Sequence, residues 1–328
     1  MSKKYLFIMD TITDIDPSKD TTFVLMLESQ RRGVNNYYCQ IADLMWADGN
    51  TKVSAQAITV FSPWQNRDYC ALKAPEFFNL SDFAVVWMRK DPPVDQDFLV
   101  ATMLLDMHDH PRTLMMNNPQ GLRLANEKLW GLMAFELMPH TVVSAHATFL
   151  REKCREFGKV VLKPIFGAGG AGILVFDHND RNLSSAIDLL TEHGQKVITM
   201  QKFIPKAREG DKRVLLLGGE PIGAVLRVPH DQDHRANMHV GGNALKAKID
   251  DNDRHIAAIL KPKLLELGLH FVGIDIIDKK LTEINVTSPT GAQEIDALDK
   301  RMGSDRIPAQ VMDYVDHIFS VANDGKII

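Results

Sequence analysis

The residues best suited to chemistry lie on a predicted β-hairpin in the C-terminal part of the chain. Residues 272–277 and 281–286 are rich in β-branched side chains and are joined by a short polar turn, a pattern typical of two paired strands. If the middle residue of that turn is its centre, Asp275 lies directly opposite Glu283, and the two-residue period of a strand places Asn285 on the same face. The other face is then the buried one, and it carries Ile274, Ile276, Ile284 and Val286.

Two carboxylates in direct cross-strand register repel each other. At about 4 Å and an effective dielectric of about 20, the repulsion is on the order of 4 kcal/mol. Two carboxylates and an amide oxygen, without His or Cys, suit a hard cation of the Mg²⁺ type, which also takes water and substrate phosphates as ligands. The alternative is a surface hairpin whose acids are solvated or are neutralised by Lys279 or Lys280.

Composition restricts the class of protein. The 328 residues are enough for two or three domains, and 45% apolar with 24% charged residues is typical of a globular protein. A formal net charge of -4 gives no general electrostatic reason to bind nucleic acid or an anionic membrane. Cys39, Cys70 and Cys154 show no disulfide or zinc-site spacing, and the N-terminal apolar run is too short for a signal sequence. We therefore expect a cytoplasmic protein with no nucleic-acid or membrane partner.

Alternating strand and helix patterns in the first part of the chain predict an open α/β sheet. A helix is expected from Asp20, as its cap, through Arg32, and strands are expected at 5–9, 37–42, 57–61, 83–88 and 113–116. Arg89 and Lys90 directly follow one of these strands, at the carboxyl edge where ligands collect in open sheets. They are candidates to hold a substrate carboxylate, or they are solvated charges after a strand.

A glycine-rich segment follows the N-terminal part. A helix is expected from Asn118 through Lys128 to Trp130, and strands at 160–163 and 173–176 then flank the glycine-rich residues 164–172. Glycine permits positive φ and lets backbone N–H groups approach an anion closely. The segment does not match a Walker A loop, because a strand follows it, and it indicates either a flap over a nucleotide or a flexible surface loop.

A second predicted hairpin carries arginines. Its strands, 213–217 and 222–228, contain Arg213 and Arg227, and it leads into a polar loop, 229–242, that contains Arg235 and Asn237. Long loops of this kind are often functional lids or are disordered. Arginines in this region are suited to bind phosphate or carboxylate with two hydrogen bonds.

Taken together, these features indicate a nucleotide site. Lys128, Lys163 with the glycine flap, Arg213 and the acidic hairpin are the parts needed to bind ATP and to neutralise charge during phosphoryl transfer.

Four motifs resemble one known family. They are Met-Arg-Lys-Asp-Pro-Pro at 88–93, Asn-Glu-Lys-Leu at 126–129, Gly-Asp-Lys-Arg at 210–213 and Thr-Glu-Ile-Asn-Val-Thr-Ser-Pro-Thr at 282–290. In these motifs the chain resembles the bacterial glutathione synthetases, which are ATP-grasp ligases, and the match runs from Tyr5 to about Asp296. The resemblance implies an enzyme that joins γ-glutamylcysteine to glycine through an acyl phosphate, with ATP as co-substrate and with glutathione, ADP and phosphate as products.

The resemblance also implies roles for individual residues. The positions expected to bind ATP are Lys128, Lys163, Gly167, Gly169, Gly170, Gln201, Phe203, Ile204 and Asp211. The metal ligands are expected to be Asp275, Glu283 and Asn285, with Mg²⁺ as the metal and Mn²⁺ as the alternative. Catalysis is expected from Arg213, Arg227 and Arg235. Peptide-substrate binding is expected from Arg89, Lys90, Asn237, Ser288 and Thr290.

The implied architecture is an ATP-grasp fold of the α/β (α+β) class. We expect an N-terminal open α/β domain at 1–124, a central lid domain at 125–203 and a C-terminal domain with the metal site at 204–328. A homo-oligomer, dimer or tetramer, is the expected assembly, and the expected ligands are small molecules.

Three loops depart from the family pattern, at 165–170, at 230–233 and at Gln293, where the family often has an arginine. They leave two alternatives open. One is a divergent ATP-grasp ligase with another acceptor, and the other is a nucleotide-binding protein of this fold that no longer catalyses.

Overall fold

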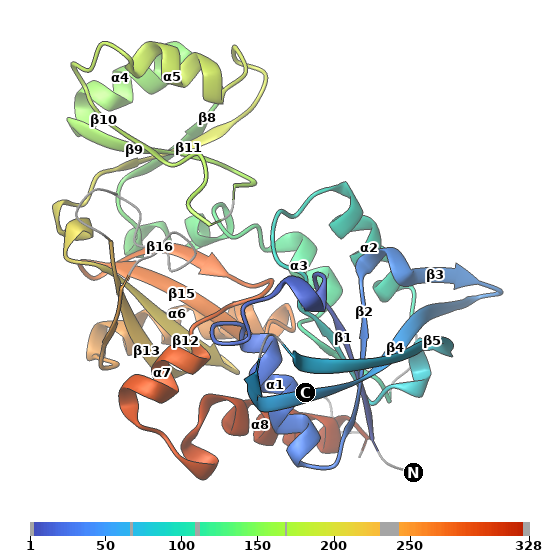
Figure 1. Cartoon of the computed structure of the whole chain (residues 1–328). Coiled ribbons are helices and arrows are strands. Elements are labelled where there is room, and N and C mark those ends of the chain that lie inside the picture. Colours follow the sequence, from blue (N-terminus) through green and yellow to red (C-terminus); the bar gives the residue numbers. More distant parts are fainter. Residues whose placement is uncertain (1–2, 66–67, 109–111, 168, 230–242, 324–328) are drawn as a thin grey trace.

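Three β-sheets and the helices packed on them make up the computed structural model, which describes residues 3–65, 68–108, 112–167, 169–229 and 243–323. Figure 1 shows the central sheet with its two helices standing apart, above the N-terminal and C-terminal parts, which lie side by side. Helix α8 (Ile307–Asn323), near the end of the chain, lies beside α1 (Thr21–Arg31), near its beginning. The arrangement is mixed α/β, as the sequence predicts.

The N-terminal sheet has the order β3-β4-β2-β1-β6-β7, with β5 paired to β4. Its strands are β1 (Lys4–Ile8), β2 (Asn35–Cys39), β3 (Leu44–Ala47), β4 (Asn50–Gln65), β5 (Asp68–Asn79), β6 (Val85–Met88) and β7 (Leu114–Met116). Strand β1 pairs in parallel with β2 and β6, and β6 pairs in parallel with β7, which confirms the predicted open sheet. The predicted strand at 57–61 is only a piece of the long antiparallel ribbon β4–β5.

Helices α1, α2 (Gln96–Asp106) and α3 (Pro119–Leu124) accompany this sheet. The Phe23 N–H donates to the Asp20 carboxylate at 2.7 Å, so Asp20 is the predicted N-cap of α1. The prediction of one helix from Asn118 to Trp130 is wrong. Helix α3 stops at Leu124. The Asn126 side chain then accepts hydrogen bonds from the N–H groups of Lys128 and Leu129, and this forms a turn before η4 (Trp130–Leu137).

The central sheet is fully antiparallel, in the order β10-β9-β11-β8. Its elements are β8 (Thr141–Ser144), α4 (Ala147–Phe157), β9 (Lys159–Pro164), β10 (Leu174–Asp177), α5 (Leu183–Leu190) and β11 (Ile198–Lys202). A separate hydrophobic core holds the two helices against the sheet, and it includes Leu150, Leu162, Ile187 and Met200.

The C-terminal sheet is also antiparallel, in the order β14-β13-β12-β15-β16. Its elements are β12 (Asp211–Leu217), β13 (Glu220–Val228), β14 (Asn243–Lys246), α6 (Asp251–Glu266), β15 (Phe271–Ile277), β16 (Lys280–Asn285), α7 (Ala292–Asp299) and α8.

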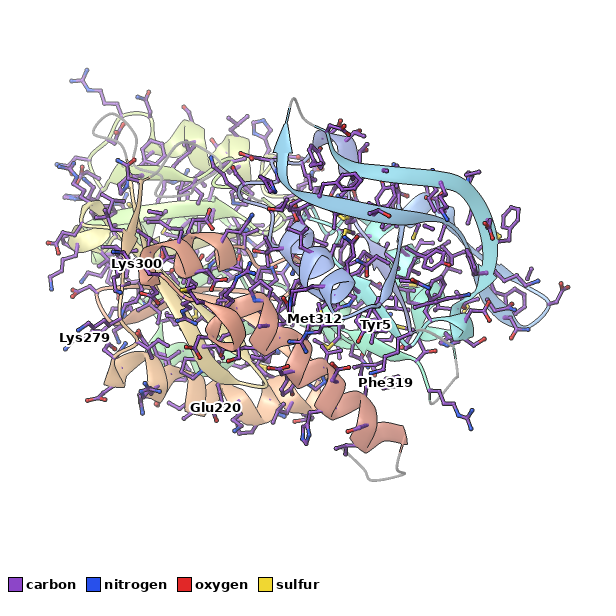
Figure 2. All side chains as sticks on the ribbon, turned by 60° about the horizontal axis from the view of Figure 1, so that its bottom comes forward. Tyr5, Glu220, Lys279, Lys300, Met312 and Phe319 are labelled. Atoms are coloured by element: carbon purple, nitrogen blue, oxygen red, sulfur yellow. The ribbon has the colours of Figure 1, made fainter. Side chains whose placement is uncertain are left out.

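The N-terminal and C-terminal parts share hydrophobic cores. Tyr5 of β1 and Met312 of α8 are buried in one common cluster with Phe271 of β15, and Figure 2 shows Met312 on the side of α8 that faces Tyr5. Two of the sheets are therefore held together by apolar packing, while the central sheet has its own core. Among the described residues, no helix combines the length and apolar character needed to cross a membrane.

Candidate active site

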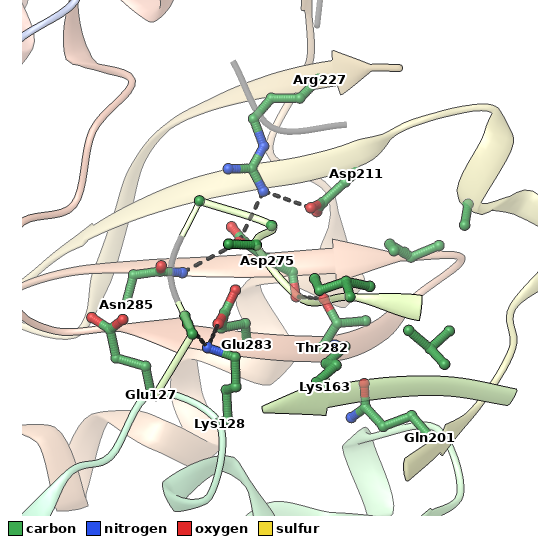
Figure 3. Close-up of a pocket in the computed structure, with 18 of the residues that line it drawn as sticks. Glu127, Lys128, Lys163, Gln201, Asp211, Arg227, Asp275, Thr282, Glu283 and Asn285 are labelled. Carbon is green, nitrogen blue, oxygen red and sulfur yellow. Dashed lines mark hydrogen bonds and ion pairs between the residues drawn. The ribbon is translucent and has the colours of Figure 1, made fainter. Parts of the chain in front are cut away.

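A cavity of about 670 Å³ lies between the central sheet and the C-terminal sheet. Its walls include Lys163 and Gln201 from the central sheet and Asp211, Asp275 and Glu283 from the C-terminal sheet, and Figure 3 shows these side chains directed toward a common space. The volume falls in the range of about 300 to 1,000 Å³ that is typical of small-molecule sites.

In the hairpin β15–β16, Asp275 and Glu283 lie in the predicted register, but the turn that joins the strands differs from the predicted one. Asp275 pairs with Glu283, but the turn is shorter than expected: it consists of Asp278 and Lys279, both at positive φ (45° and 68°). A bulge near Thr282 then restores the register, and the Thr282 hydroxyl donates to the Asp275 carbonyl at 3.1 Å. The predicted buried face is confirmed, with each of its four apolar residues at most 3% exposed.

Two arginines offset the charge of Asp275. Arg213 donates to both Asp275 oxygens, from Nε to Oδ1 and from Nη2 to Oδ2 at 2.9 Å, and Arg227 Nη2 lies 2.9 Å from Oδ2. Burial alone would raise the pKa of Asp275, but the two guanidinium groups hold this pKa well below its usual range. Lys280 of the hairpin has a different partner: its Nζ donates to the Glu136 carbonyl, at 3.2 Å.

Gly273 makes room for this ion pair. It lies on β15 opposite Leu215 of β12, and a Cβ atom there would be 3.0 Å from Arg213 Cδ and 3.2 Å from Pro289 Cβ. A glycine inside an otherwise β-branched strand therefore marks a close approach of the Arg213 side chain to the backbone.

Asp211 has one oxygen in an ion pair and one without a partner. Its Oδ2 accepts from Arg227 Nη2 at 2.6 Å, while its buried Oδ1 has no hydrogen-bond partner among the described residues. Burial raises the pKa of Asp211 to about 6, Arg227 opposes this rise, and Asp275 adds to it. A buried acceptor without a donor fits the hydroxyl groups of a sugar.

The two predicted phosphate lysines lie on either side of Glu283. Lys128 Nζ is 3.3 Å from Glu283 Oε1 and also contacts the Gly167 carbonyl of the glycine loop. Lys163 lines the cavity from β9, and burial lowers its pKa, whereas Glu283 raises it and Lys128 lowers it further. Both lysines thus line the same cavity, where their amines can neutralise an anion, and Figure 3 shows the Lys128 amine beside Glu283.

The predicted nucleotide-base segment lies at the end of β11. Gln201 Nε2 donates to the Thr141 hydroxyl at 3.2 Å, and Gln201, Phe203 and Ile204 all line the cavity. The apolar residues Ile173 and Val175, which follow the glycine-rich segment, also line the cavity. This apolar part, next to the polar part described above, suits a flat heterocycle joined to a charged group.

The other predicted residues fall into three groups. Gly167, Gly169, Gly170, Ser288 and Thr290 line the cavity. Arg89 and Lys90 are not among its lining residues, and Arg235 and Asn237 lie outside the described residues.

Arg89 supports the site from behind. Its guanidinium donates to the Pro289 carbonyl at 3.0 Å and to the Thr22 hydroxyl at 3.1 Å, and burial lowers its pKa to about 10. Lys90 Nζ pairs with Asp10 at 2.7 Å. In this structure both cations contact protein groups, so Arg89 fixes the loop that carries Ser288 and Thr290.

Sequence reasoning missed Glu127 and Thr282, which also line the cavity. Glu127 was expected inside a helix, and the signals for it were its position directly before Lys128 and its place in the motif at 126–129. Thr282 was expected on the buried face, and the bulge turns it toward the cavity.

The donor atoms on the hairpin fit a hard divalent cation. Asp275 and Glu283 supply carboxylates, and Asn285, whose Nδ2 donates to Asp275 Oδ2 at 3.2 Å, brings an amide oxygen to the same place. Over the described part of the chain, no three His, Cys, Asp or Glu side chains gather as a metal site, so the candidate site consists of two carboxylates and one amide. A cation with water and phosphate ligands suits such a set.

Comparison with known proteins agrees with this geometry. The profile of the prokaryotic glutathione synthetase N-terminal domain matches residues 4–123, and that of the prokaryotic glutathione synthetase ATP-grasp domain matches residues 127–300. Glutathione synthetase of Thermosynechococcus vestitus is 43% identical over 313 residues, which cover 93% of this chain and 97% of the relative. That of Photorhabdus laumondii is 40% identical over 291 residues, covering 88% and 92%.

Solved structures share the fold at low identity. A D-cycloserine synthetase has a TM-score of 0.65 at 14% identity and covers 96% of this chain and 99% of its own. A macrocyclase from Microcystis aeruginosa, bound to a precursor peptide, has a TM-score of 0.60 at 14% identity with the same coverage. With two profiles that together span most of its length, the chain belongs to the prokaryotic glutathione synthetase family of ATP-grasp ligases.

Proposed function

We propose that the protein is an ATP-dependent ligase that joins γ-glutamylcysteine to glycine and forms glutathione, ADP and phosphate. The observation that carries this proposal is the single cavity in which Lys128, Lys163, Arg213, Asp275 and Glu283 meet. Relatives about 40% identical over nearly the whole chain carry the name glutathione synthetase.

The first step transfers phosphate to the cysteinyl carboxylate. A carboxylate oxygen attacks the γ-phosphorus of ATP, the bond to the bridging oxygen breaks, and ADP leaves. Lys128 and Lys163 bind and orient the phosphates, and Arg213, already held at the metal face by Asp275, is placed to stabilise the charge that develops on the transferred group. Asp275, Glu283 and Asn285 would hold the metal, which would supply Lewis-acid neutralisation of the phosphate charge.

The second step forms the amide. The neutral glycine amine attacks the carbonyl carbon of the acyl phosphate, the bond from this carbon to the phosphate oxygen breaks, and the nitrogen gives up one proton to the departing phosphate. Arg227 holds Asp211 and Asp275 in place during both steps.

Finer points of the proposal follow from the family. We propose Mg²⁺ as the metal, a homo-oligomer, dimer or tetramer, as the assembly, the cytoplasm as the location, and the domain limits 1–124, 125–203 and 204–328. We also propose the ATP, metal, catalytic and peptide-substrate roles given above for the individual residues, with Arg89 acting through the loop that it supports.

The alternatives gain no support from the structure. Gln293, which replaces a common arginine, donates to the Pro17 carbonyl at 2.7 Å and is not among the cavity residues. Gln293 therefore gives no reason to expect an amine substrate other than glycine. A nucleotide binder without activity has no need for a metal face, phosphate lysines and paired arginines in one cavity.

The test is ADP release by the purified protein with ATP and Mg²⁺. With γ-glutamylcysteine and glycine both present, ADP and glutathione should form in equal amounts, and leaving out either substrate should reduce ADP formation to background. Turnover with a different amine in place of glycine, and not with glycine, would replace the proposal with a divergent ligase. Tight ATP binding without any turnover would contradict enzyme function.

A further inference from the structure

Strand β16, which carries Glu283 and Asn285, lies at the edge of its sheet. The order of the sheet ends with β15-β16, so only one side of β16 is paired to a strand. In an antiparallel pair, alternate residues direct their N–H groups away from the neighbour. An edge with unbonded N–H groups is free to shift or fray, and that would displace the side chains between them.

A single residue, Glu127, accepts hydrogen bonds from N–H groups at this edge. The Ile284 N–H donates to the Glu127 main-chain carbonyl at 3.2 Å, and the Val286 N–H donates to Glu127 Oε1 at 3.0 Å. The same Oε1 accepts from the Thr287 N–H at 3.2 Å and from the Thr287 hydroxyl at 2.9 Å. Glu127 thus provides two acceptors, its main-chain carbonyl and its Oε1, which bind alternate N–H groups as the carbonyls of a neighbouring strand would.

The residue bracketed by these bonds is Asn285, one of the proposed metal ligands. The next residue after Glu127 is Lys128, whose amine lies 3.3 Å from Glu283. One short segment therefore fixes the edge of the metal face and also brings a phosphate lysine to it. Figure 3 shows Glu127 beside both Asn285 and Lys128.

Glu127 is not explained as an ion-pair partner. Within the described residues it forms no ion pair. Burial raises the pKa of Glu127, and the charge of another carboxylate, Glu283, raises it further. A glutamate kept next to a like charge needs another reason to be there. The three donors on Oε1 provide one, because they use the oxygen as an acceptor and do not depend on full negative charge.

We propose that Glu127 is a positioning residue, which holds Asn285 and Glu283 in metal-binding geometry through the backbone of β16 and couples them to Lys128. This rests on the proposed metal site and goes beyond it, because Glu127 is assigned no contact with the metal or with the reacting atoms. Outer partners of metal ligands typically change metal affinity by about 10-fold to 100-fold when they are removed.

Two substitutions separate geometry from charge. Glu127→Gln keeps the length and an acceptor oxygen, whereas Glu127→Asp keeps the charge and shortens the reach by one methylene. The proposal predicts that Mn²⁺ binds the Glu127→Gln enzyme, saturated with ADP, within about 3-fold of the wild-type dissociation constant, and that Glu127→Asp weakens Mn²⁺ by about 10-fold or more. Electron paramagnetic resonance of free Mn²⁺ measures both constants.

Lys280→Ala is the matched control, because it lies on the same strand with an exposed side chain and should leave Mn²⁺ binding unchanged. The opposite order, with Glu127→Asp near wild type and Glu127→Gln impaired, would overturn the proposal and make the charge itself essential. Equal binding by all variants would also overturn it. If a variant does not fold, hydrogen exchange of the backbone amides in the wild-type protein tests the proposal. The Ile284 and Val286 N–H groups should exchange as slowly as those of inner strands, and fast exchange would contradict their hydrogen bonds to Glu127.

This test does not depend on the identity of the product. Mn²⁺ binding can confirm or contradict the role of Glu127 whether or not glutathione is formed, and the ADP-release assay decides the function independently.

Discussion

The wall of the cavity formed by the C-terminal sheet holds its charged side chains in ion pairs, whereas the wall formed by the central sheet offers a buried lysine and the backbone of a glycine loop. On the first wall, Arg213, Arg227, Asp211 and Asp275 form one chain of contacts between 2.6 and 2.9 Å, apart from a shorter Arg213 bond. On the second, Gly169 and Gly170 have positive φ values of 61° and 80°.

The difference shows how one site can be rigid and adaptable at once. The C-terminal wall is anchored in cores that it shares with the N-terminal part, so its charges are fixed before any ligand arrives. The central wall belongs to a sheet with a separate core, and the glycines of its loop permit backbone conformations that residues with a Cβ atom rarely adopt. Substitutions on the first wall should therefore affect chemistry and folding, and those on the second should mainly affect nucleotide binding.

The largest effect is expected from Glu283→Gln on the C-terminal wall. Loss of one carboxylate from the metal face should reduce kcat by about 10³-fold, because metal stabilisation of phosphoryl transfer is worth several kcal/mol. The variant should fold normally, since the Glu283 side chain is not part of a core. Steady-state ADP release checks this, with circular dichroism as the control for folding, and wild-type turnover would refute the metal assignment.

Arg213→Met should lower stability most. It leaves the buried Asp275 carboxylate with Arg227 as its remaining cation, and breaking a buried pair in this way costs about 3 kcal/mol or more. Urea unfolding measures the change. Lys206→Met removes an exposed pair with Asp278 and should leave the midpoint unaltered. If both variants unfold at the wild-type midpoint, the C-terminal wall is not held by its ion pairs.

Gly172→Ala tests the central wall. Gly172 has a φ of 73°, and a Cβ atom there would lie 2.8 Å from Pro164 Cγ, whereas a Cβ atom on Gly169 would meet nothing within 4 Å. We expect the KM for ATP to rise about 10-fold for Gly172→Ala and less for Gly169→Ala, since both carry the strain of positive φ but only the first adds a clash. A fall in stability as large as that of Arg213→Met would erase the contrast between the walls.

The smallest effect concerns pH. The pKa of Asp211 is raised to about 6 in the folded protein, so its carboxylate gains a proton as the pH falls through 6. A protonated Asp211 can no longer accept from two sugar hydroxyls, and ATP affinity should weaken several-fold between pH 7 and pH 5. Isothermal titration of ATP at these pH values measures it. Asp211→Asn should remove this dependence, and an unchanged slope in that variant would assign it to another group.

Much of the C-terminal wall could be predicted from the sequence, because a hairpin with alternating Ile and acidic residues specifies its own faces. The pairing of Asp275 with Glu283 was correct even though the turn was not, since a shorter turn and a bulge at Thr282 compensate each other. Local pattern does not reveal such compensation. The arginine partners of Asp275 were expected to bind phosphate or a carboxylate of a ligand, and their pairing with this protein carboxylate depends on the order of strands in the sheet.

The contacts between distant segments could not be predicted. Arg89 follows a strand as expected, yet it meets Pro289, 200 positions further along the chain. Glu127 had the pattern of a helical residue, and only the folded chain brings it to the edge of β16. The ribbon β4–β5 was reduced to a short strand because its register shifts interrupt the alternation.

The most direct measurement of the central claim follows oxygen from substrate to product. γ-Glutamylcysteine labelled with ¹⁸O in its cysteinyl carboxylate should be turned over with ATP and glycine, and the inorganic phosphate analysed by mass spectrometry. An acyl phosphate requires one labelled oxygen to leave with phosphate and the other to remain in the new amide. Unlabelled phosphate, with the second labelled oxygen released as water, would contradict the account.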